Sequence, residues 1–332
     1  MIVSRTPVRI SFVGGGSDLA GFYAHEPGAV VATGIDKYIY ITVNQKFDRK
    51  IRASYSVTEV AESVHELRNE LIRESLKLLG LDSGIEITSV SDIPSEGTGL
   101  GSSSTYTVGL LHALHAYTGQ HVGAERLARE ACHVEIELCG KPIGKQDQYI
   151  AAYGGLQYLH FNADGSVFVD PIICRPETKR ELQRRLIMLY TDMTRSADDV
   201  LREQRANTET LVETRSALRC LTHLARDLCS VLRADDLESF GEILHHAWML
   251  KRGLASGISN RCIDRWYETA REHGAVGGKI LGAGGGGFLL LYAPPDRHRD
   301  ILSALPELRA VPFRFEPQGS KIVYVEEGGH GE

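Results

Sequence analysis

A loop rich in glycine and serine, PSEGTGLGSSSTY at residues 94–106, carries the clearest chemical signal in the chain. Glycine allows positive φ and close approach of the backbone to a ligand. The serines precede a helical pattern, and a helix start presents free N–H groups and a partial positive charge. Together these features predict a phosphate cradle. The Gly-Lys-Ser/Thr of a Walker A motif is missing, and a glycine turn with a serine cap remains the alternative for this loop alone.

A second glycine-rich segment reads GGKILGAGGGGFLLLY at residues 277–292. Four successive glycines, Gly284–Gly287, lie between two apolar runs that are typical of strands. A flexible linker is the alternative, but linkers are rarely bounded so tightly by core strands. The pattern favours a loop whose backbone lies against a ligand.

Near the amino terminus, residues 5–19 read RTPVRISFVGGGSDL. A strand-like run carries Arg9, glycines turn the chain at residues 14–16, and Asp18 follows. A dinucleotide-binding fingerprint is the obvious rival, but the spacing fails because the next glycine is Gly21 and no helix start is evident. Taken alone, the segment would be a glycine turn with a solvated aspartate.

A fourth segment, HVEIELCGKPIGKQDQYIAAYGG at residues 133–155, supplies acidic groups. Glu135 and Glu137 lie near an expected helix end, and Asp147 follows two glycines in an irregular stretch. Acidic residues in loops are usually solvated. This segment therefore gains weight only in combination with the three glycine loops.

A mixture of strands and helices must position these segments. Helical spacing is expected from Val60 to a stop at Gly80, over residues 106–117, and in long charged helices up to about residue 273. Strands and helices do not alternate regularly, which favours an α+β fold over a doubly wound sheet. We place a domain boundary near residue 175, where a charged run follows Pro176. Strand patterns cover residues 8–13, 30–43, 85–90, 155–161, 166–173, 186–190, 277–281 and 288–292.

Composition narrows the class of protein. The chain has 332 residues, 42% of them hydrophobic, and a formal net charge of −6 without a basic block, so nucleic acid is a poor candidate partner. It shows neither an apolar run long enough for a membrane span nor a signal-peptide core, so we expect a cytoplasmic protein without a membrane partner. The cysteines form no CxxC pair, and we expect free thiols at Cys132, Cys139, Cys174, Cys220, Cys229 and Cys262.

In combination, these segments resemble the GHMP family of small-molecule kinases, and the three signature segments stand in the right order along the chain. The loop at residues 94–106 looks like the family's ATP loop, RTPVRISFVGGGSDL like its first motif, and KILGAGGGGF like its third. The resemblance implies a two-domain α+β fold, with a ribosomal-protein-like ATP-binding domain at residues 1–175 and a ferredoxin-like domain at residues 176–332. The active site would lie between the domains.

Within the family, the first motif and GKPIGKQDQYIAAYGG are most similar to bacterial D-glycero-D-manno-heptose 7-phosphate kinases, with fucokinases next. Galactokinases carry an acidic-histidine pair before the aspartate, and this chain lacks it. The resemblance implies phosphorylation of the anomeric hydroxyl of a heptose 7-phosphate, giving the 1,7-bisphosphate for nucleotide-activated heptose synthesis. An L-fucokinase-like or other sugar 1-kinase is the alternative.

The resemblance also assigns roles to residues. Asp147 would be the base or orienter for the sugar hydroxyl, with Arg9 beside it, while Ser103 and Glu135 would hold Mg²⁺. Glu137 is the second choice for the metal and is expected to be solvated. The ATP phosphates would meet Gly97, Gly99, Leu100, Gly101, Ser102, Ser103 and Ser104. The sugar would meet Gly15, Gly16, Asp18, Gly284, Gly285, Gly286, Lys145 and Arg195, with Lys141, Lys251 and Arg252 as further candidates for its phosphate.

A sugar- or ATP-binding regulator on the same fold, with catalysis lost, is the alternative of another class. Retention of Ser103, Glu135 and Asp147 speaks against it. The expected partners are ATP, Mg²⁺ and a small sugar substrate, with a homo-oligomer left open.

Overall fold

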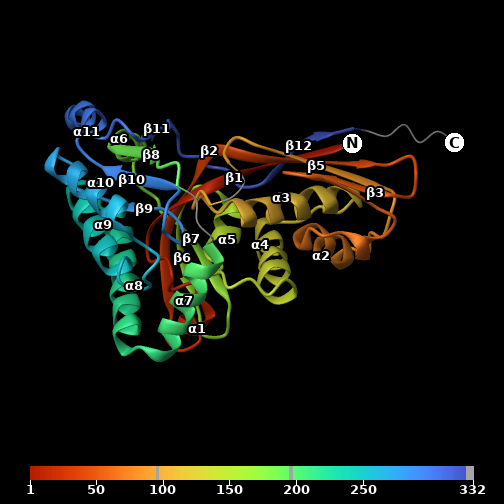
Figure 1. Ribbon diagram of the computed structural model, residues 1–332, viewed down its shortest axis with the longest axis horizontal. Helices are drawn as coiled ribbons and strands as arrows, with labels where there is room; N and C mark the ends of the chain where they lie inside the picture. Colours follow the sequence, from red (N-terminus) through yellow and green to blue (C-terminus); the bar gives the residue numbers. More distant parts are fainter. Residues whose placement is uncertain (95–96, 194–196, 327–332) are drawn as a thin grey trace.

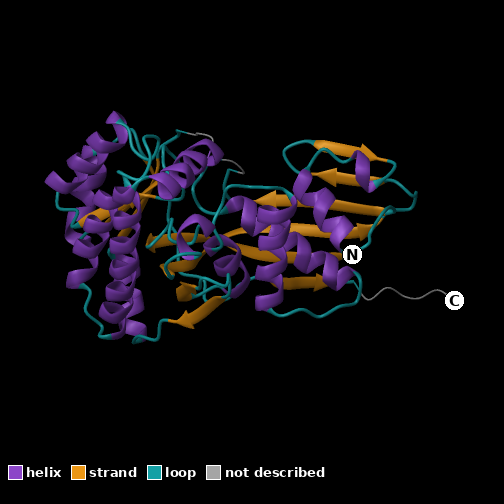
Figure 2. Ribbon diagram, turned by 90° about the horizontal axis from the view of Figure 1, so that it is seen from below, coloured by secondary structure: helices purple, strands orange, loops and turns teal. Residues whose placement is uncertain are grey.

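The larger of two β-sheets contains eight strands in a computed structural model that describes residues 1–94, 97–193 and 197–326 (Figures 1 and 2). Its strands are β1 (Ile2–Val13), β2 (Gly28–Gln45), β3 (Ile51–Ser54), β4 (Thr58–Ala61), β5 (Ile85–Ser91), β6 (Leu156–Phe161), β7 (Val167–Pro171) and β12 (Lys321–Val325). They follow the order β12-β1-β2-β5-β3-β4, with β6 paired to β2 and β7 to β6. Only β3 and β5 pair in parallel among these strands.

Helices cover one face of this sheet (Figure 1). Alternate side chains of β2, at Ile39, Ile41 and Val43, are buried beneath them, as the period of two in a half-covered strand requires. Helix α3 packs directly on β1 and β2, and α4 packs against α3 and α5. The helices are α1 (Ala20–Tyr23), α2 (Glu70–Leu78), α3 (Ser102–Tyr117), α4 (Ala124–Cys132), a π-helical turn (His133–Leu138) and α5 (Gln146–Tyr153), with a short 3₁₀ turn at Val64–Glu66.

The second sheet is built from β8 (Leu186–Tyr190), β9 (Gly277–Ile280), β10 (Phe288–Tyr292) and β11 (Arg309–Ala310). Its order, β11-β8-β10-β9, with a helical layer between β8 and β9 and a helix between β10 and β11, is that of a ferredoxin-like βαββαβ unit. The helices are α6 (Pro176–Arg184), α7 (Ala197–Thr210), α8 (Val212–Arg233), α9 (Glu238–Lys251), α10 (Arg261–Glu272) and α11 (His298–Ala304), preceded by a 3₁₀ turn at Pro295–Arg297. Among the described residues, no helix is long and apolar enough to cross a bilayer.

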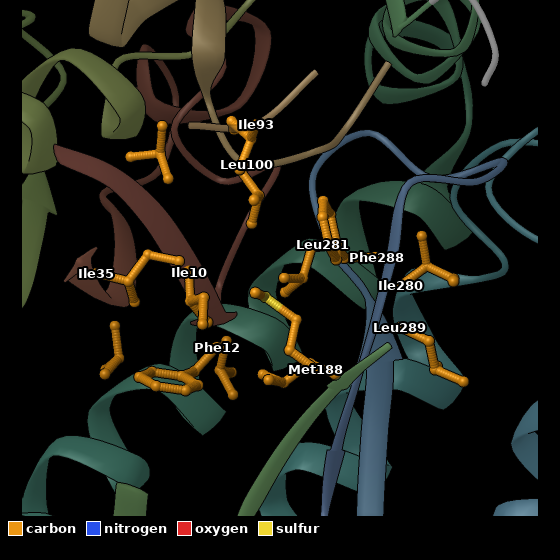
Figure 3. Close-up of a cluster of buried hydrophobic side chains, with 14 of the residues drawn as sticks. Ile10, Phe12, Ile35, Ile93, Leu100, Met188, Ile280, Leu281, Phe288 and Leu289 are labelled. Atoms are coloured by element: carbon orange, nitrogen blue, oxygen red, sulfur yellow. The ribbon is translucent and has the colours of Figure 1, made fainter. Parts of the chain in front are cut away.

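A continuous hydrophobic core joins the two sheets. Figure 3 shows Ile10 and Phe12 of β1 facing Met188 of β8 and Leu281, which follows β9. The Phe12 ring also meets Phe240 of α9 edge-on, with centroids 5.4 Å apart. Because apolar burial is the main stabilising contribution in folding, this core holds the site between the sheets in a fixed geometry.

We expect Phe12→Ala to lower the free energy of unfolding by about 3–5 kcal/mol, because it leaves a cavity in this shared core. The measurement is urea denaturation followed by circular dichroism. Phe168→Ala is the matched control, since Phe168 on β7 is largely exposed and should lose little stability. Equal losses in the two variants would contradict the importance of the shared core.

The predicted α+β fold with a ferredoxin-like second unit is confirmed, but one local expectation differs from the structure. The helix expected from Val60 is wrong: Val60 lies exposed in β4, and the helix begins only at Glu70, capped by the Asn69 side chain, before ending near Gly80. Sheet pairing of β4 with β3 overrides the helical spacing there. The thiols are free as expected.

The domain boundary near residue 175 stays a prediction, although the strands change sheet between β7 and β8. The carboxyl-terminal strand departs from the simple division at that residue. Strand β12 leaves the second unit and pairs with β1, so that it lies beside the beginning of the chain (Figure 1). The expected range 176–332 therefore includes one strand of the first sheet.

Candidate active site

The ATP-loop candidate connects β5 to α3. Gly97, Gly99 and Gly101 all have positive φ, between 67° and 74°, which glycine adopts without the strain of a side chain. Helix α3 begins at Ser102, so its first N–H groups face out of the helix end and are available to an anion. Leu100 is fully buried, and its carbonyl accepts a hydrogen bond from the Arg9 backbone at 3.0 Å. This contact ties the loop to β1.

The loop from Leu281 to Gly287 lies directly on the ATP-loop candidate. An ideal Cβ on Gly99 would lie 2.3 Å from Leu281 O, and one on Gly287 would lie 2.4 Å from Thr98 O. Gly282 lines a pocket that also contains Arg9 and Asp147, which is called the central pocket below. By contrast, Gly284 packs against Ile258, and added Cβ atoms at Gly284 and Gly286 would strike backbone of the second unit. Gly284 and Gly286 therefore allow this loop to pack closely against other backbone segments of the second unit.

We expect Gly99→Ala to separate the two glycine loops, lowering the melting temperature and raising KM for ATP. The new Cβ would clash with backbone, and overpacking of this kind costs about 1–3 kcal/mol. Gly119→Ala is the matched control, because Gly119 has a similar φ of 75° but open space around its Cα. Equal effects in both variants would mean that φ strain alone, without loop contact, explains the result.

Asp147 and Arg9 form a two-pronged ion pair at the floor of the site. Arg9 Nε donates to Asp147 Oδ1 at 2.7 Å and Nη2 donates to Oδ2 at 2.8 Å. A third bond, 2.6 Å from Arg9 Nη1 to Gly99 O, links the pair to the ATP-loop candidate. The Arg9 side chain is buried, whereas 23% of the Asp147 side chain is exposed, so its carboxylate still reaches the pocket. The expected proximity of the two residues is therefore seen.

Glu135 is held beside the start of α3. Ser103 Oγ donates to Glu135 Oε1 at 2.6 Å, and Gln148 Nε2 donates to Oε2 at 2.6 Å. The π-helical turn His133–Leu138 places Glu135 there, and such turns are frequent at functional sites. Burial disfavours the ionised form of Glu135 and raises its pKa to about 7, and a bound cation would stabilise that ionised form.

The oxygen atoms of Ser103 and Glu135 form a donor set that fits Mg²⁺, a hard cation that prefers oxygen ligands and is often shared with substrate phosphates. Glu137, the second choice, points elsewhere. Its exposed side chain pairs with His133 at 2.7 Å, as expected of a solvated residue.

Asp18 is buried at the edge of the pocket. Its Oδ1 accepts from Gly16 N at 2.8 Å, and its Oδ2 accepts from Gln146 N at 3.2 Å and Gln146 Nε2 at 3.1 Å. Burial raises its pKa, while these backbone bonds oppose the rise. Gly144 passes so close that a Cβ there would lie 2.0 Å from Asp18 Oδ2. The glycine turn therefore fixes this carboxylate between the first motif and the segment that carries Asp147.

The central pocket is lined by Arg9, Asp18 and Asp147 together with residues of the second unit. Gly16 lines it, and Gly15 lies next to the ammonium of Lys251; their contact with a sugar stays a prediction. Lys251 is buried at the end of α9, and burial lowers its pKa to about 8. The pocket is lined by Arg9, Ser11, Gly16, Asp18, Leu19, Ile143, Gly144, Gln146, Asp147, Leu201, Gln204, Lys251, Gly282 and Ala283.

Most of the other basic candidates have partners outside this pocket. Lys145 Nζ donates to Gly165 O at 2.6 Å and lies over the Tyr23 ring. Lys141 pairs with Glu70, and Arg252 pairs with Asp264. Arg195 lies outside the described residues. The assignments of Lys145 and Arg195 to the sugar stay predictions.

Several residues at the site were not anticipated. The sequence could have indicated Ser11 and Gln146, because Ser11 shares a strand face with Arg9 and Gln146 directly precedes Asp147. Lys279 could also have been identified from the sequence, because it is a charged residue in an apolar strand. Its buried ammonium donates to Ser11 O at 2.8 Å and Phe12 O at 3.1 Å, tying β9 to β1. Gln204 gave no signal, because its helix is distant in sequence.

Comparisons with known families match both halves of the chain. The model for the GHMP kinases N terminal domain matches residues 58–155, which include the ATP-loop candidate, Glu135 and Asp147. The model for the GHMP kinases C terminal matches residues 228–309, which include Lys251 and the Gly284–Gly287 loop.

Two curated relatives are sugar kinases by name. The chain is 28% identical to D-glycero-alpha-D-manno-heptose 7-phosphate kinase of Campylobacter jejuni, over 96% of this chain and 98% of the relative. It is 26% identical to the bifunctional fucokinase/GDP-fucose pyrophosphorylase of Arabidopsis thaliana, over 86% of this chain and 29% of that protein.

A solved structure described as a D-glycero-D-manno-heptose 1-phosphate kinase from Bacteroides thetaiotaomicron has a TM-score of 0.81. It is 24% identical and covers 98% of this chain and 100% of that one, which establishes the shared fold. The names of the heptose kinases differ in the phosphate that they mention, so they do not fix the hydroxyl that reacts in this chain.

Proposed function

We propose a substrate for this chain, which belongs to the GHMP kinase family and is an ATP-dependent sugar kinase: D-glycero-D-manno-heptose 7-phosphate, phosphorylated on its anomeric hydroxyl. The observation that carries the proposal is the likeness to the Campylobacter heptose 7-phosphate kinase over nearly the whole length of both chains. The product would be the 1,7-bisphosphate, for use in nucleotide-activated heptose synthesis in the cytoplasm.

The proposed chemistry uses Asp147 as the group that orients the reacting hydroxyl and accepts its proton. Its two hydrogen bonds from Arg9 fix the carboxylate, and its partial exposure leaves it open to the pocket. Arg9 would also stabilise charge that develops on the transferred phosphoryl group. The anomeric hydroxyl is more acidic than other sugar hydroxyls, so a single aspartate suffices as the base.

The nucleotide would lie with its phosphates on the backbone of residues 97–104, at the amino end of α3. Ser103 and Glu135 would hold Mg²⁺, which when bound supplies charge neutralisation for the β- and γ-phosphates. Arg9 connects this region to Asp147 through Gly99 O. The ion pair between Arg9 and Asp147 would thus lie next to both the sugar hydroxyl and the phosphate to be transferred.

L-Fucose is the second candidate, favoured by the likeness to the Arabidopsis fucokinase. The two sugars differ in charge, because only the heptose 7-phosphate brings a phosphate. A residue that binds this phosphate should matter far more for the phosphorylated sugar than for its unphosphorylated analogue. Lys145 and Arg195 are the proposed anchors.

A sugar panel with coupled ADP detection tests the substrate. Heptose 7-phosphate, mannose, fucose and galactose are compared in the unmodified protein, and heptose 7-phosphate should give the highest kcat/KM. Lys145→Ala and Arg195→Ala are then compared on heptose and heptose 7-phosphate. Much better turnover of fucose or mannose than of heptose 7-phosphate would overturn this substrate, while leaving the sugar-kinase activity in place.

A further inference from the structure

The central pocket contains buried polar atoms that have no protein partner. Within the described part of the chain, Ser11 Oγ, Gln146 Oε1 and Gln204 Nε2 are fully buried and make no hydrogen bond. All three residues line the pocket with Asp18 and Lys251. Buried polar groups in native proteins are nearly always hydrogen-bonded, so several unsatisfied groups around one pocket indicate a polar ligand.

The second unit supplies two of the groups. Gln204 comes from the middle of α7, and its side chain is 1% exposed. Its amide nitrogen lies against the first glycine turn, because an ideal Cβ on Gly16 would be only 2.4 Å from Nε2. Lys251 comes from the last turn of α9 and lies on the other side of the same turn, 3.4 Å from an ideal Cβ on Gly15. Glycine at position 16 leaves room for the Gln204 amide.

The charges in the pocket indicate hydroxyl groups as the matching ligand chemistry. The lining cations are Arg9 and Lys251, and the lining carboxylates are Asp147 and Asp18. Arg9 is held by Asp147, and Lys251 is balanced by the nearby charge of Asp18. Among the lining residues a phosphate would find no cation without a carboxylate nearby, and it would face the buried carboxylate of Asp18. Neutral hydroxyls can donate to Asp18 and Gln146 Oε1 and accept from Lys251 and Gln204.

We infer that Gln204 and Lys251 determine sugar specificity by each donating a hydrogen bond to a non-reacting hydroxyl of the sugar, at a subsite bounded by Ser11, Asp18 and Gln146. This inference rests on the proposed sugar-kinase chemistry but not on heptose as the sugar. Helices α7 and α9 of the second unit then bind the non-reacting hydroxyls of the sugar, while residues of the first unit position the reacting groups. Any phosphate already on the sugar lies outside this subsite.

Substitutions paired with deoxy sugars test the inference. Gln204→Met and Lys251→Met keep side-chain length and remove the donor. Each is assayed on heptose 7-phosphate and on analogues that lack the hydroxyl at C2, C3, C4 or C6, or, if the panel selects fucose, on fucose and its analogues that lack the hydroxyl at C2, C3 or C4. With the parent sugar, kcat/KM should fall about 3- to 10-fold for Gln204→Met and about 10- to 100-fold for Lys251→Met.

The decisive result is the pattern among the analogues. For each variant, one deoxy analogue should show almost no further loss, because the bond that the substitution removes is already missing. KM for ATP should stay within about twofold of its original value. Equal losses on all analogues would overturn the inference and indicate a merely structural role. Arg205→Met is the control, since Arg205 on the exposed side of α7 pairs with Glu209.

A second readout does not depend on turnover. Heptose 7-phosphate, or fucose, should raise the melting temperature of the unmodified protein without ATP, and this rise should shrink in both variants but not in Arg205→Met. If Lys251→Met does not fold, the test rests on Gln204, for which Gln204→Glu is a second variant that keeps the size of the side chain and loses both amide N–H donors. A sugar-induced rise without any phosphorylation would sink the proposed function but retain this subsite. Phosphorylation of the sugar together with equal losses on all deoxy analogues would support the proposed function and overturn this subsite.

Discussion

Asp147→Asn should lower kcat about 10²- to 10⁴-fold, while folding and ATP binding persist. Asparagine keeps the shape of the side chain and can still accept one bond from Arg9, but it cannot take the proton of the sugar hydroxyl. The pair that it disturbs is the bidentate contact at 2.7 and 2.8 Å. Steady-state kinetics with saturating sugar give kcat, and circular dichroism with nucleotide titration checks the fold and ATP binding.

Asp170→Asn is the matched control for this variant. Asp170 also pairs with an arginine, Arg233 at 2.7 Å, but the pair is half-exposed and neither residue lines the pocket. Exposed pairs contribute little to stability. The control should keep kcat within about twofold. If Asp147→Asn also kept near-normal kcat, Asp147 would lose its role as proton acceptor and only its positioning by Arg9 would remain.

Glu135→Gln should raise the Mg²⁺ concentration needed for half-maximal rate by about 10- to 100-fold, with a smaller rise for Ser103→Ala. The range is the one that loss of groups around a bound metal usually produces. Glutamine keeps one carbonyl oxygen but loses the charge that attracts a hard cation. Rates measured across a Mg²⁺ titration give the constant. Unchanged metal dependence in both variants would contradict the assignment of these two residues.

The same titration should depend on pH. Burial raises the pKa of Glu135 to about 7, so below that pH a proton competes with Mg²⁺ for the carboxylate. The apparent Mg²⁺ requirement should therefore rise as the pH falls below about 7 and level off above it. Glu135→Gln should lack this slope. A requirement that is flat between pH 6 and 8 in the unmodified protein would argue against Glu135 as the ligand.

Short motifs made much of the site predictable from sequence. The glycines at residues 97–101 and Ser103 at the start of α3 follow from local patterns, whereas the pairing of Arg9 with Asp147 was implied by the family resemblance. Each motif works through backbone geometry within a few residues. Agreement of several such motifs in order carried more information than any one of them.

Other features depend on packing between distant segments and could not be predicted. Val60 has helical spacing to its neighbours, but pairing of β4 with β3 decides its conformation. The crossing of β12 to β1 joins residues more than 300 positions apart. Gln204 enters the pocket because α7 packs over the first glycine turn, and nothing in its own sequence surroundings indicates that contact, whereas Lys251 was already a candidate for the substrate phosphate.

Phosphorus NMR of one reaction mixture tests the central claim most directly. Heptose 7-phosphate, ATP and Mg²⁺ are incubated with the unmodified protein and, separately, with Asp147→Asn. We expect one new phosphomonoester resonance, coupled to the anomeric proton and matched by an equal amount of ADP, in the first sample only. ADP with free inorganic phosphate, or no turnover of any sugar in the panel, would contradict a site built to transfer a phosphoryl group to a sugar hydroxyl.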